Sequence, residues 1–204
     1  MTTVTTIDLL RHGACEGGEI FRGSSDVALS EDGWRQMHDA VADEGGWDLV
    51  LCSPLQRCAR FAEELAQNRK LAFRQETRLR EISFGDWENR THVDVQREHG
   101  DLLRQFWRDP LSVTPPGGES MVAFRDRVMT PMRELQEEYC GRHILLVTHG
   151  AVIRVLLCEW LQMSYQAFSS FAVPYASFSR LRLYHQEGRA PWVQLCLHRG
   201  EGHI

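Results

Sequence analysis

The sequence predicts an α/β protein: a three-layer α/β/α sandwich with a mostly parallel central sheet and a C-terminal antiparallel hairpin. Short apolar runs at residues 4–10, 47–52 and 144–148 alternate with stretches of helical character. This alternation is typical of parallel strands joined by helices. Residues 177–184 and 192–198 instead alternate residue by residue around a Glu-Gly turn, which predicts a β-hairpin added to the sheet edge.

Length and charge set limits on the class of protein. At 204 residues the chain is long enough for one domain, and we expect residues 1–204 to form it. The formal net charge of −5 gives no general attraction to nucleic acid. No apolar stretch approaches the roughly 20 residues that span a bilayer, and residues 1–6 lack the features of a signal peptide. We therefore expect a cytoplasmic protein without nucleic-acid or membrane partners.

The six cysteines indicate neither a metal site nor a disulfide framework. They show no C-x-x-C pair and no zinc-like spacing, so we expect no metal and no cofactor. Most lie in apolar runs and are interpreted as reduced thiols used as small core residues. Cys15 is the exception, because it follows a charged motif. Cys15 is either a small core residue or a reactive thiol. In the second case nearby cations would lower its pKa and make it sensitive to oxidation.

The first strand ends in a cation, an imidazole and a glycine, Arg11-His12-Gly13. Packing does not require this triplet, and ligands of open α/β sheets bind beyond the carboxyl ends of strands. A polar, glycine-rich loop follows over residues 15–26. Ser30 then caps a helix with acidic residues in its first turn, and we expect that helix to reach about Asp43.

The second strand, residues 47–52, leads into a helix that starts near Pro54 and runs to about Asn68. Arg57 lies in the first turn of this helix. It is either a solvated surface arginine or a third cation that points into the crevice, beside a helix end that itself favours anions. A short strand is expected at residues 71–73.

Residues 79–88 have neither helical period nor regular alternation, so we expect a loop shaped for a site rather than core. Residues 91–107 read as a polar helix, and the wider segment 82–118 is expected to form a cap over the site. A long helix follows at residues 121–139, interrupted or kinked near Pro131.

The strand at residues 144–148 ends in His149-Gly150 and is followed by a helix at residues 151–160. If it lies parallel to the first strand, the imidazoles of His12 and His149 enter one crevice. A neutral imidazole is a competent nucleophile near pH 7. Arg11 and Arg57 would supply bidentate donors that match phosphate oxygens.

This set of residues suits phosphoryl transfer, which needs alignment and charge stabilisation more than covalent chemistry, and it could work without metal. The departing alkoxide still requires a proton. Glu81 is the candidate acid, and its alternative is a partner in a surface ion pair. Asp86 and Glu88 in the same loop are the next candidates.

Five motifs in order resemble the histidine phosphatase superfamily, the phosphoglycerate-mutase-like group. They are the Leu-Leu-Arg-His-Gly opening, Ser53-Pro54 with Arg57, residues 81–87, the Pro-Gly-Gly-Glu-Ser stretch and Thr148-His149-Gly150. The resemblance spans roughly residues 7–157. It implies that His12 is phosphorylated, that Glu81 donates and accepts the proton, and that Arg11, Arg57 and His149 bind phosphate.

The loop at residues 16–26 and the Leu29–Met37 stretch are similar to the bacterial α-ribazole phosphatase branch, which acts in assembling the nucleotide loop of cobalamin. We expect five neighbouring positions to contact substrate or phosphate: Gly13, Cys15, Arg22, Gly23 and Gly150. Three positions depart from the family pattern. Ala14 replaces an acid, Cys15 replaces a hydroxyl residue, and Asn89 replaces a glycine.

The residues therefore favour a phosphatase of a small phosphorylated metabolite, with α-ribazole 5′-phosphate as the first candidate. A phosphoglycerate mutase is an alternative, although mutases carry a longer insertion after Glu81. A non-catalytic phosphate-binding or scaffold protein is a third reading, although a pure binder has no need of Glu81. The oligomeric state is open, with a homodimer as one expectation.

Overall fold

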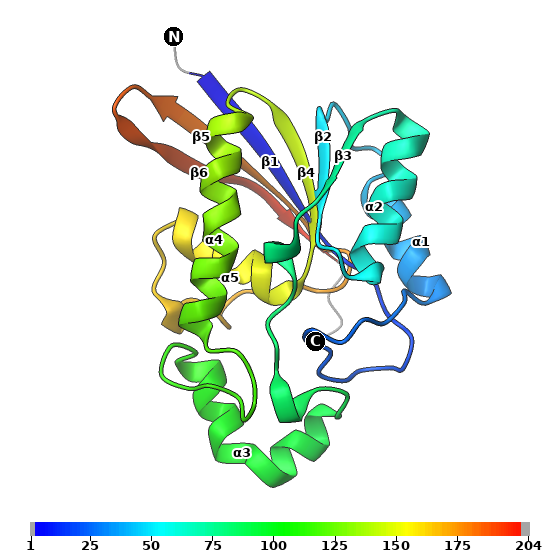
Figure 1. Ribbon diagram of the computed structural model, residues 1–204, viewed down its shortest axis with the longest axis vertical. Helices are drawn as coiled ribbons and strands as arrows, with labels where there is room; N and C mark the ends of the chain where they lie inside the picture. Colours follow the sequence, from blue (N-terminus) through cyan, green and yellow to red (C-terminus); the bar gives the residue numbers. More distant parts are fainter. Residues whose placement is uncertain (1–2, 201–204) are drawn as a thin grey trace.

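A six-stranded mixed sheet forms the middle layer of the protein (Figure 1). The computed structural model describes residues 3–200, so residues 1–2 and 201–204 of the expected domain lie outside the described residues. The strands are β1 (Thr3–Arg11), β2 (Leu49–Cys52), β3 (Ala72–Gln75), β4 (His143–Thr148), β5 (Phe178–Gln186) and β6 (Arg189–Arg199). Their order is β3-β2-β4-β1-β5-β6. The first four are parallel, and β5 and β6 form the antiparallel hairpin at one edge, as predicted.

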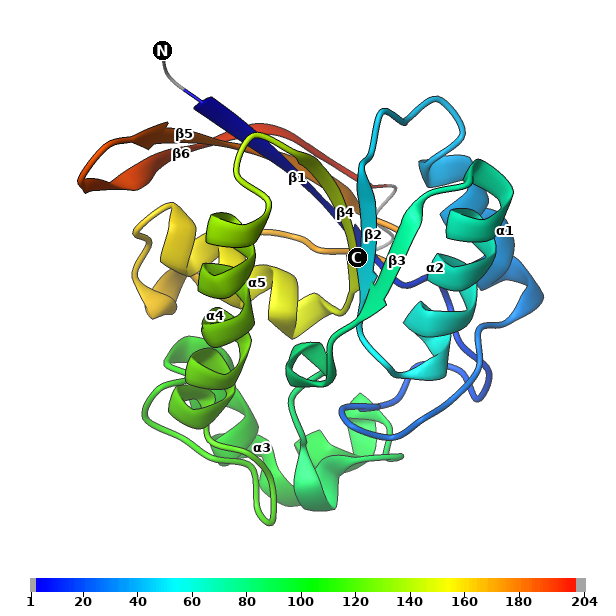
Figure 2. The ribbon, with the colours of Figure 1, turned by 45° about the horizontal axis from the view of Figure 1, so that its top comes forward.

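Helices cover both faces of the sheet, which confirms the three-layer fold. They are α1 (Glu31–Ala40), α2 (Gln56–Arg69), α3 (His92–Arg108), α4 (Met121–Glu138) and α5 (Gly150–Trp160). Figures 1 and 2 show α1 and α2 on one side of the sheet and α4 and α5 on the other. Alternate residues of β1 supply the two cores: Ile7 and Leu9 pack on the α4–α5 side and Leu10 on the α1–α2 side.

Local sequence signals account for the helix starts. The Ser30 side chain accepts a hydrogen bond from the backbone N–H of Gly33, as the predicted cap of α1. Ser120 and Thr91 cap α4 and α3 in the same way. The predicted end of α1 near Asp43 is wrong, because the helix ends at Ala40 and turns follow.

Two helices depart from expectation. The predicted interruption at Pro131 is wrong, since α4 runs through this residue from Met121 to Glu138. Helix α3 instead carries a break, with non-helical backbone angles at His99, next to Gly100. Gly100 favours this break because glycine in a helix interior is destabilising relative to alanine.

The segment at residues 79–88 is more buried than its composition suggests. It folds into a loop with a 3₁₀ turn at Gly85–Trp87. Ile82, Phe84 and Trp87 belong to the core on the α4–α5 side, and Trp87 is fully buried. The prediction that this stretch lies outside the core is therefore wrong, because its apolar and aromatic side chains pack into this core. In Figure 1, α3 lies beyond the carboxyl ends of the parallel strands.

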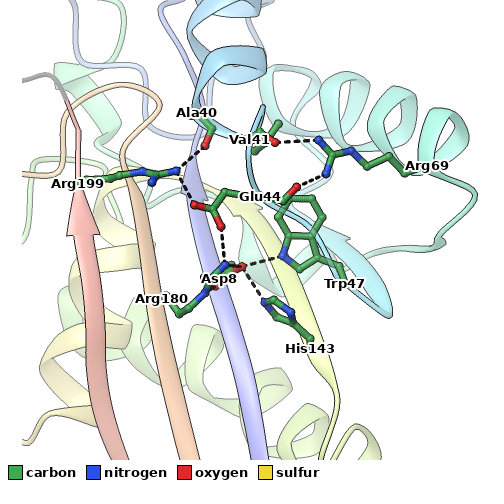
Figure 3. A network of polar contacts seen from close by, with 9 residues as sticks. All are labelled: Asp8, Ala40, Val41, Glu44, Trp47, Arg69, His143, Arg180 and Arg199. Atoms are coloured by element: carbon green, nitrogen blue, oxygen red, sulfur yellow. Dashed lines mark hydrogen bonds and ion pairs between the residues drawn. The ribbon is translucent and has the colours of Figure 1, made fainter.

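A buried carboxylate ties the sheet to the α1–α2 layer (Figure 3). Asp8 of β1 is fully buried and accepts hydrogen bonds from Arg180, Trp47 and His143 at 2.7 to 2.8 Å. Glu44 pairs with Arg180 as well. Burial alone would raise the pKa of Asp8, but these hydrogen bonds outweigh it and the pKa lies below its ordinary value. β5, β4 and the loop after α1 are thereby fixed to β1.

Candidate active site

The two His-Gly motifs meet at one edge of the sheet, as predicted. β1 and β4 are parallel neighbours in which Arg11 lies opposite Thr148. The backbone N–H of His12 donates to the carbonyl of Thr148 at 2.9 Å. As a result the ring centroids of His12 and His149 are 5.3 Å apart.

One hydrogen bond selects the reactive nitrogen of His12. Its Nδ1 lies 2.8 Å from the carbonyl oxygen of Gly13. A carbonyl only accepts, so Nδ1 carries the proton and Nε2 keeps its lone pair. Burial, together with the charges of Arg57 and Arg11, lowers the pKa of His12 well below its ordinary value. The imidazole is therefore neutral, and Nε2 is the nitrogen available as a nucleophile.

His149 is fully buried directly behind this ring. Its Nε2 lies 2.7 Å from the hydroxyl of Ser53, which follows β2, and the Cys58 thiol packs against the ring. Burial and the positive charge of Arg57 lower the pKa of His149 well below its ordinary value. Both imidazoles are therefore held neutral by the same surroundings.

Three arginines surround His12 and are held by backbone carbonyls. Arg57, fully buried at the start of α2, donates to the carbonyls of Ser25 and Gly23 at 2.6 and 2.7 Å. It is thus the inward-pointing cation rather than a surface residue. Arg22 donates to the carbonyls of residues 15, 16 and 18. Arg11 donates to the carbonyl of Val173, and its guanidinium lies 4.3 Å from the Tyr175 ring centre.

These arginines have no carboxylate partner within ion-pair distance among residues 3–200. The Nε atoms of all three are buried without a hydrogen-bond partner. Burying uncompensated cations costs free energy. Such a cluster is suited to binding an anion of high charge, such as a phosphate group.

A cavity of about 190 Å³ opens above His12. Its wall is formed by Arg11, His12, Ile20, Phe21, Arg22, Gly23, Arg57, Glu81, Phe84, His92, Phe106, Trp107, Gly150, Ala151, Arg154, Phe168, Val173 and Tyr175. The predicted residues Arg22, Gly23 and Gly150 are among them, and segment 82–118 contributes four aromatic or imidazole side chains. Sequence reasoning missed Arg154 and Tyr175.

Each missed residue has a different explanation. Arg154 lies four residues after Gly150, hence on the same face of α5, and this spacing could have found it. Tyr175 comes from an irregular segment without periodicity, so only the fold brings it to the site. Its ring lies 5.6 Å from that of His12, and its hydroxyl accepts a hydrogen bond from Arg22.

Glu81 lines the cavity and is not a surface ion-pair residue. Its two carboxylate oxygens accept hydrogen bonds from the backbone N–H groups of Ile82 and Ala151, each at 3.1 Å. Burial raises the pKa of Glu81 above its ordinary value, and the Ala151 hydrogen bond and the charge of Arg57 only partly oppose this. A carboxyl group with a raised pKa is suited to donating a proton.

The loop that carries Glu81 is clamped from α4. Arg127 donates to the carbonyls of Arg78, Arg80 and Glu81. It also forms a two-point ion pair with Glu119, at 2.9 and 2.7 Å. Glu119 belongs to the Pro-Gly-Gly-Glu-Ser motif. This motif therefore helps to position the loop that carries Glu81.

Glu88 has a structural task as well. Its carboxylate accepts hydrogen bonds from the backbone N–H groups and hydroxyls of Ser24 and Ser25, and from the backbone N–H of Phe84. Burial would raise the pKa of Glu88, but these bonds lower it below its ordinary value. A carboxylate so held is a poor proton donor, which favours Glu81 over Glu88 as the candidate acid. It fixes the loop whose carbonyls hold Arg57.

Gly13 and Cys15 lie behind His12 rather than on the cavity wall. A Cβ on Gly13 would lie 2.2 Å from the carbonyl oxygen of Gly33, so this glycine allows α1 to approach the strand end. The Cys15 thiol packs against His12, with Sγ 3.6 Å from Nδ1. Burial raises the pKa of Cys15, and the neighbouring arginines only partly oppose it. The expectation of a lowered pKa is therefore wrong.

The departure at Asn89 has a backbone explanation. Its φ of 62° lies in the left-handed region, where glycine is usual and asparagine is tolerated better than most residues. Its backbone N–H donates to the carbonyl of Phe21 at 2.7 Å, which joins the loop to the cap segment. The replacement keeps the local geometry.

Within residues 3–200, no group of three or more His, Cys, Asp or Glu side chains is arranged to hold a metal ion. None of the helices in this range has the length and apolar character required to cross a membrane.

The sheet order and the paired histidine strands define the phosphoglycerate-mutase-like class of α/β folds. The profile of the histidine phosphatase superfamily (branch 1) matches residues 7–194. The chain belongs to this superfamily.

Relatives with several activities are similar to the chain. A bifunctional protein of Mycobacterium tuberculosis is 36% identical over 76% of this chain, which spans only 44% of that protein. The glucosyl-3-phosphoglycerate phosphatase of the same organism is 31% identical over 95% of this chain and 86% of its own length. The adenosylcobalamin/α-ribazole phosphatase of Escherichia coli is 29% identical, over 85% and 87%.

A solved structure of the mycobacterial glucosyl-3-phosphoglycerate phosphatase superimposes with a TM-score of 0.84. The match covers 95% of this chain and 98% of that one, at 27% identity.

Proposed function

We propose that the chain is a metal-independent phosphomonoesterase that forms a phosphohistidine on His12. The observation that carries this is the hydrogen bond from Nδ1 of His12 to the Gly13 carbonyl. It leaves Nε2 unprotonated, in a neutral ring beside buried guanidiniums that have no carboxylate partner among residues 3–200. A nucleophile and an anion site thus coincide.

The reaction follows in two steps. Nε2 of His12 attacks phosphorus, the bond from phosphorus to the substrate oxygen breaks, and the carboxyl proton of Glu81 passes to the departing oxygen. Arg11, Arg57 and His149 hold the phosphoryl oxygens in transit. Water then attacks the phosphorus of the phosphohistidine, Glu81 takes a proton from the water, the bond between phosphorus and Nε2 breaks, and inorganic phosphate leaves with His12 neutral again. Segment 82–118 acts as a cap whose aromatic side chains exclude water.

The resemblance of residues 16–26 and 29–37 to α-ribazole phosphatases favours α-ribazole 5′-phosphate as the substrate. A relative named as an adenosylcobalamin/α-ribazole phosphatase aligns over 85% of the chain. The aromatic side chains Phe84, Phe106 and Trp107 on the cavity wall would suit its planar base. This assignment would place the enzyme in the assembly of the cobalamin nucleotide loop, in the cytoplasm.

A phosphorylated carboxylic acid is the second candidate, and one observation favours it. Arg154 lines the cavity as a fourth arginine beyond those around His12. Glucosyl-3-phosphoglycerate belongs to this class of substrate. The relative that is named as a phosphatase of this compound aligns over 95% of the chain.

The test of the proposed function is His12→Ala. We expect this variant to lose turnover of phosphomonoesters and acid-labile labelling of the protein by a phosphorylated substrate. His38→Ala is the matched control, since His38 is an exposed α1 residue beside Glu64. Substantial activity in His12→Ala would refute the mechanism. Transfer of the phosphoryl group to 3-phosphoglycerate instead of water would indicate a mutase, and phosphate binding without turnover in the wild type would indicate a binding protein.

A further inference from the structure

Arg154 is the cavity residue that the proposed phosphoryl chemistry does not use. It lies on α5, and its Nη1 donates to the carbonyls of Phe168 and Phe171. The rings of the same two residues lie 5.8 and 5.2 Å from the guanidinium carbon. The side chain is therefore held in one orientation before any ligand binds.

Arg154 has no direct ion-pair partner, since no carboxylate lies within ion-pair distance of it among residues 3–200. Burial and the nearby charge of Arg11 lower the pKa of Arg154 to about 10. By contrast Arg180, elsewhere in the protein, pairs with both Asp8 and Glu44 (Figure 3).

Two nitrogens of Arg154 are free for a ligand. Its Nε and Nη2 form no hydrogen bond with any residue in the range 3–200, and neither is among the fully buried polar atoms. Arg154 lines the cavity, so its side chain is within reach of a ligand bound there. Two adjacent N–H groups of a guanidinium match the two oxygens of a carboxylate or of a phosphate.

Arg154 starts one helical turn further along α5 than Gly150. It lies four residues beyond Gly150, so its Cα is about 6 Å further along α5. Arg11 and Arg57 already surround the reacting centre. The cavity volume of about 190 Å³ is below the roughly 300–1,000 Å³ of pockets that enclose drug-sized ligands. It therefore suits a compact substrate.

We propose that Arg154 binds a carboxylate or second phosphate on the leaving group, so that the substrate is a phosphomonoester of an anionic metabolite. The inference rests on the proposed phosphomonoesterase function and selects its second substrate class. α-Ribazole 5′-phosphate has no such second anion and would be a poorer substrate.

The test compares matched substrates. We would measure kcat/KM for two pairs of substrates. Comparing 3-phosphoglycerate with glycerol 3-phosphate tests for a carboxylate. Comparing fructose 1,6-bisphosphate with fructose 6-phosphate tests for a second phosphate. α-Ribazole 5′-phosphate is the fifth substrate. A charge-assisted hydrogen bond predicts a preference of about 10- to 100-fold for one anionic member over its partner. Arg154→Gln should abolish that preference, and Arg154→Lys should retain part of it.

Arg60→Gln, an exposed arginine of α2, is the matched control and should leave the preference unchanged. The inference is overturned if the wild type shows no preference, if α-ribazole 5′-phosphate is the best substrate, or if Arg154→Gln lowers both members of each pair equally. Hydrolysis of p-nitrophenyl phosphate that depends on His12 tests the proposed function separately. If no turnover occurs, calorimetric binding of the same pairs still decides whether Arg154 selects the second anion.

Discussion

The lowered pKa of His12 has a consequence for pH dependence. Because burial and the charges of Arg57 and Arg11 lower the pKa of His12, the nucleophile stays neutral at pH values below the ordinary imidazole pKa of about 6.5. The opposite shift at Glu81 keeps the acid protonated above its own ordinary pKa. The two shifts widen the pH range in which both groups hold the forms that the first step requires.

Glu81→Gln is expected to separate substrates by leaving group. A sugar phosphate needs the proton and should lose about 10²- to 10⁴-fold in rate. p-Nitrophenyl phosphate should lose far less, because p-nitrophenolate departs without a proton, provided that phosphorylation of His12 limits the rate. Rates for both substrates, with the exposed Glu137→Gln as control, measure the difference. Equal losses would assign Glu81 to binding or to the second step.

The site residues that directly follow apolar strands could be predicted from the sequence. The site residues that reach the cavity only through the fold could not. His12, His149 and Arg57 follow apolar strands, so their place at one sheet edge was expected, and Glu81 stood out by its unusual loop. Tyr175 carries no such signal. The pKa of Cys15 was predicted in the wrong direction, because neighbouring charges are visible in a sequence and desolvation is not.

Among the elements, α4 has a function that its sequence does not show. Arg127 on this helix holds three carbonyls of the Glu81 loop and pairs with Glu119. The sequence predicted where α4 begins, but not that this helix supports the loop that carries Glu81. The continuous helix at Pro131 and the burial of Trp87 were likewise missed, since tertiary packing decides both.

Arg127→Lys is expected to misplace Glu81, because an ammonium cannot reproduce the forked contacts of a guanidinium. The rate on a sugar phosphate should fall about 10-fold or more, in line with the cost of small misplacements in a site, and p-nitrophenyl phosphate should be affected less. The same ratio measured for Arg125→Lys, an arginine of α4 paired with Asp126, should stay at the wild-type value. Loss of folding in Arg127→Lys, seen by circular dichroism, would assign the clamp to stability alone.

At the scale of the whole molecule, the buried Asp8 network connects the sheet to the α1–α2 layer (Figure 3). The sequence predicted the layers and the parallel core, because apolar runs and helical periods encode them. It did not predict this network. Asp8 lies in an apolar strand, and its partners Trp47, His143 and Arg180 come from three separate segments.

Asp8→Asn should lower the free energy of unfolding by about 1.5–3 kcal/mol at pH 7, because it removes the buried charge that accepts hydrogen bonds from Arg180 and His143, while Arg180 keeps its pair with Glu44. The pKa of Asp8 is lowered in the folded state. Its contribution is therefore present above the unfolded pKa of about 3.9 and is lost as the pH falls through the lower folded value. Urea unfolding at pH 7 and at acid pH should show the variant approaching the wild type as the pH falls. Asp126→Asn, an exposed pair, should change stability by less than about 1 kcal/mol.

The central position of β1 has a consequence for biosynthesis. The first strand to be made lies between β4 and β5, both of which are made much later. Until those strands leave the ribosome, an apolar strand has no partner on either edge, and such strands are prone to aggregate. Between the synthesis of β1 and that of β4 the nascent chain thus carries an exposed hydrophobic strand, which chaperones would protect, and His12 and His149 come together only after β4 has been made.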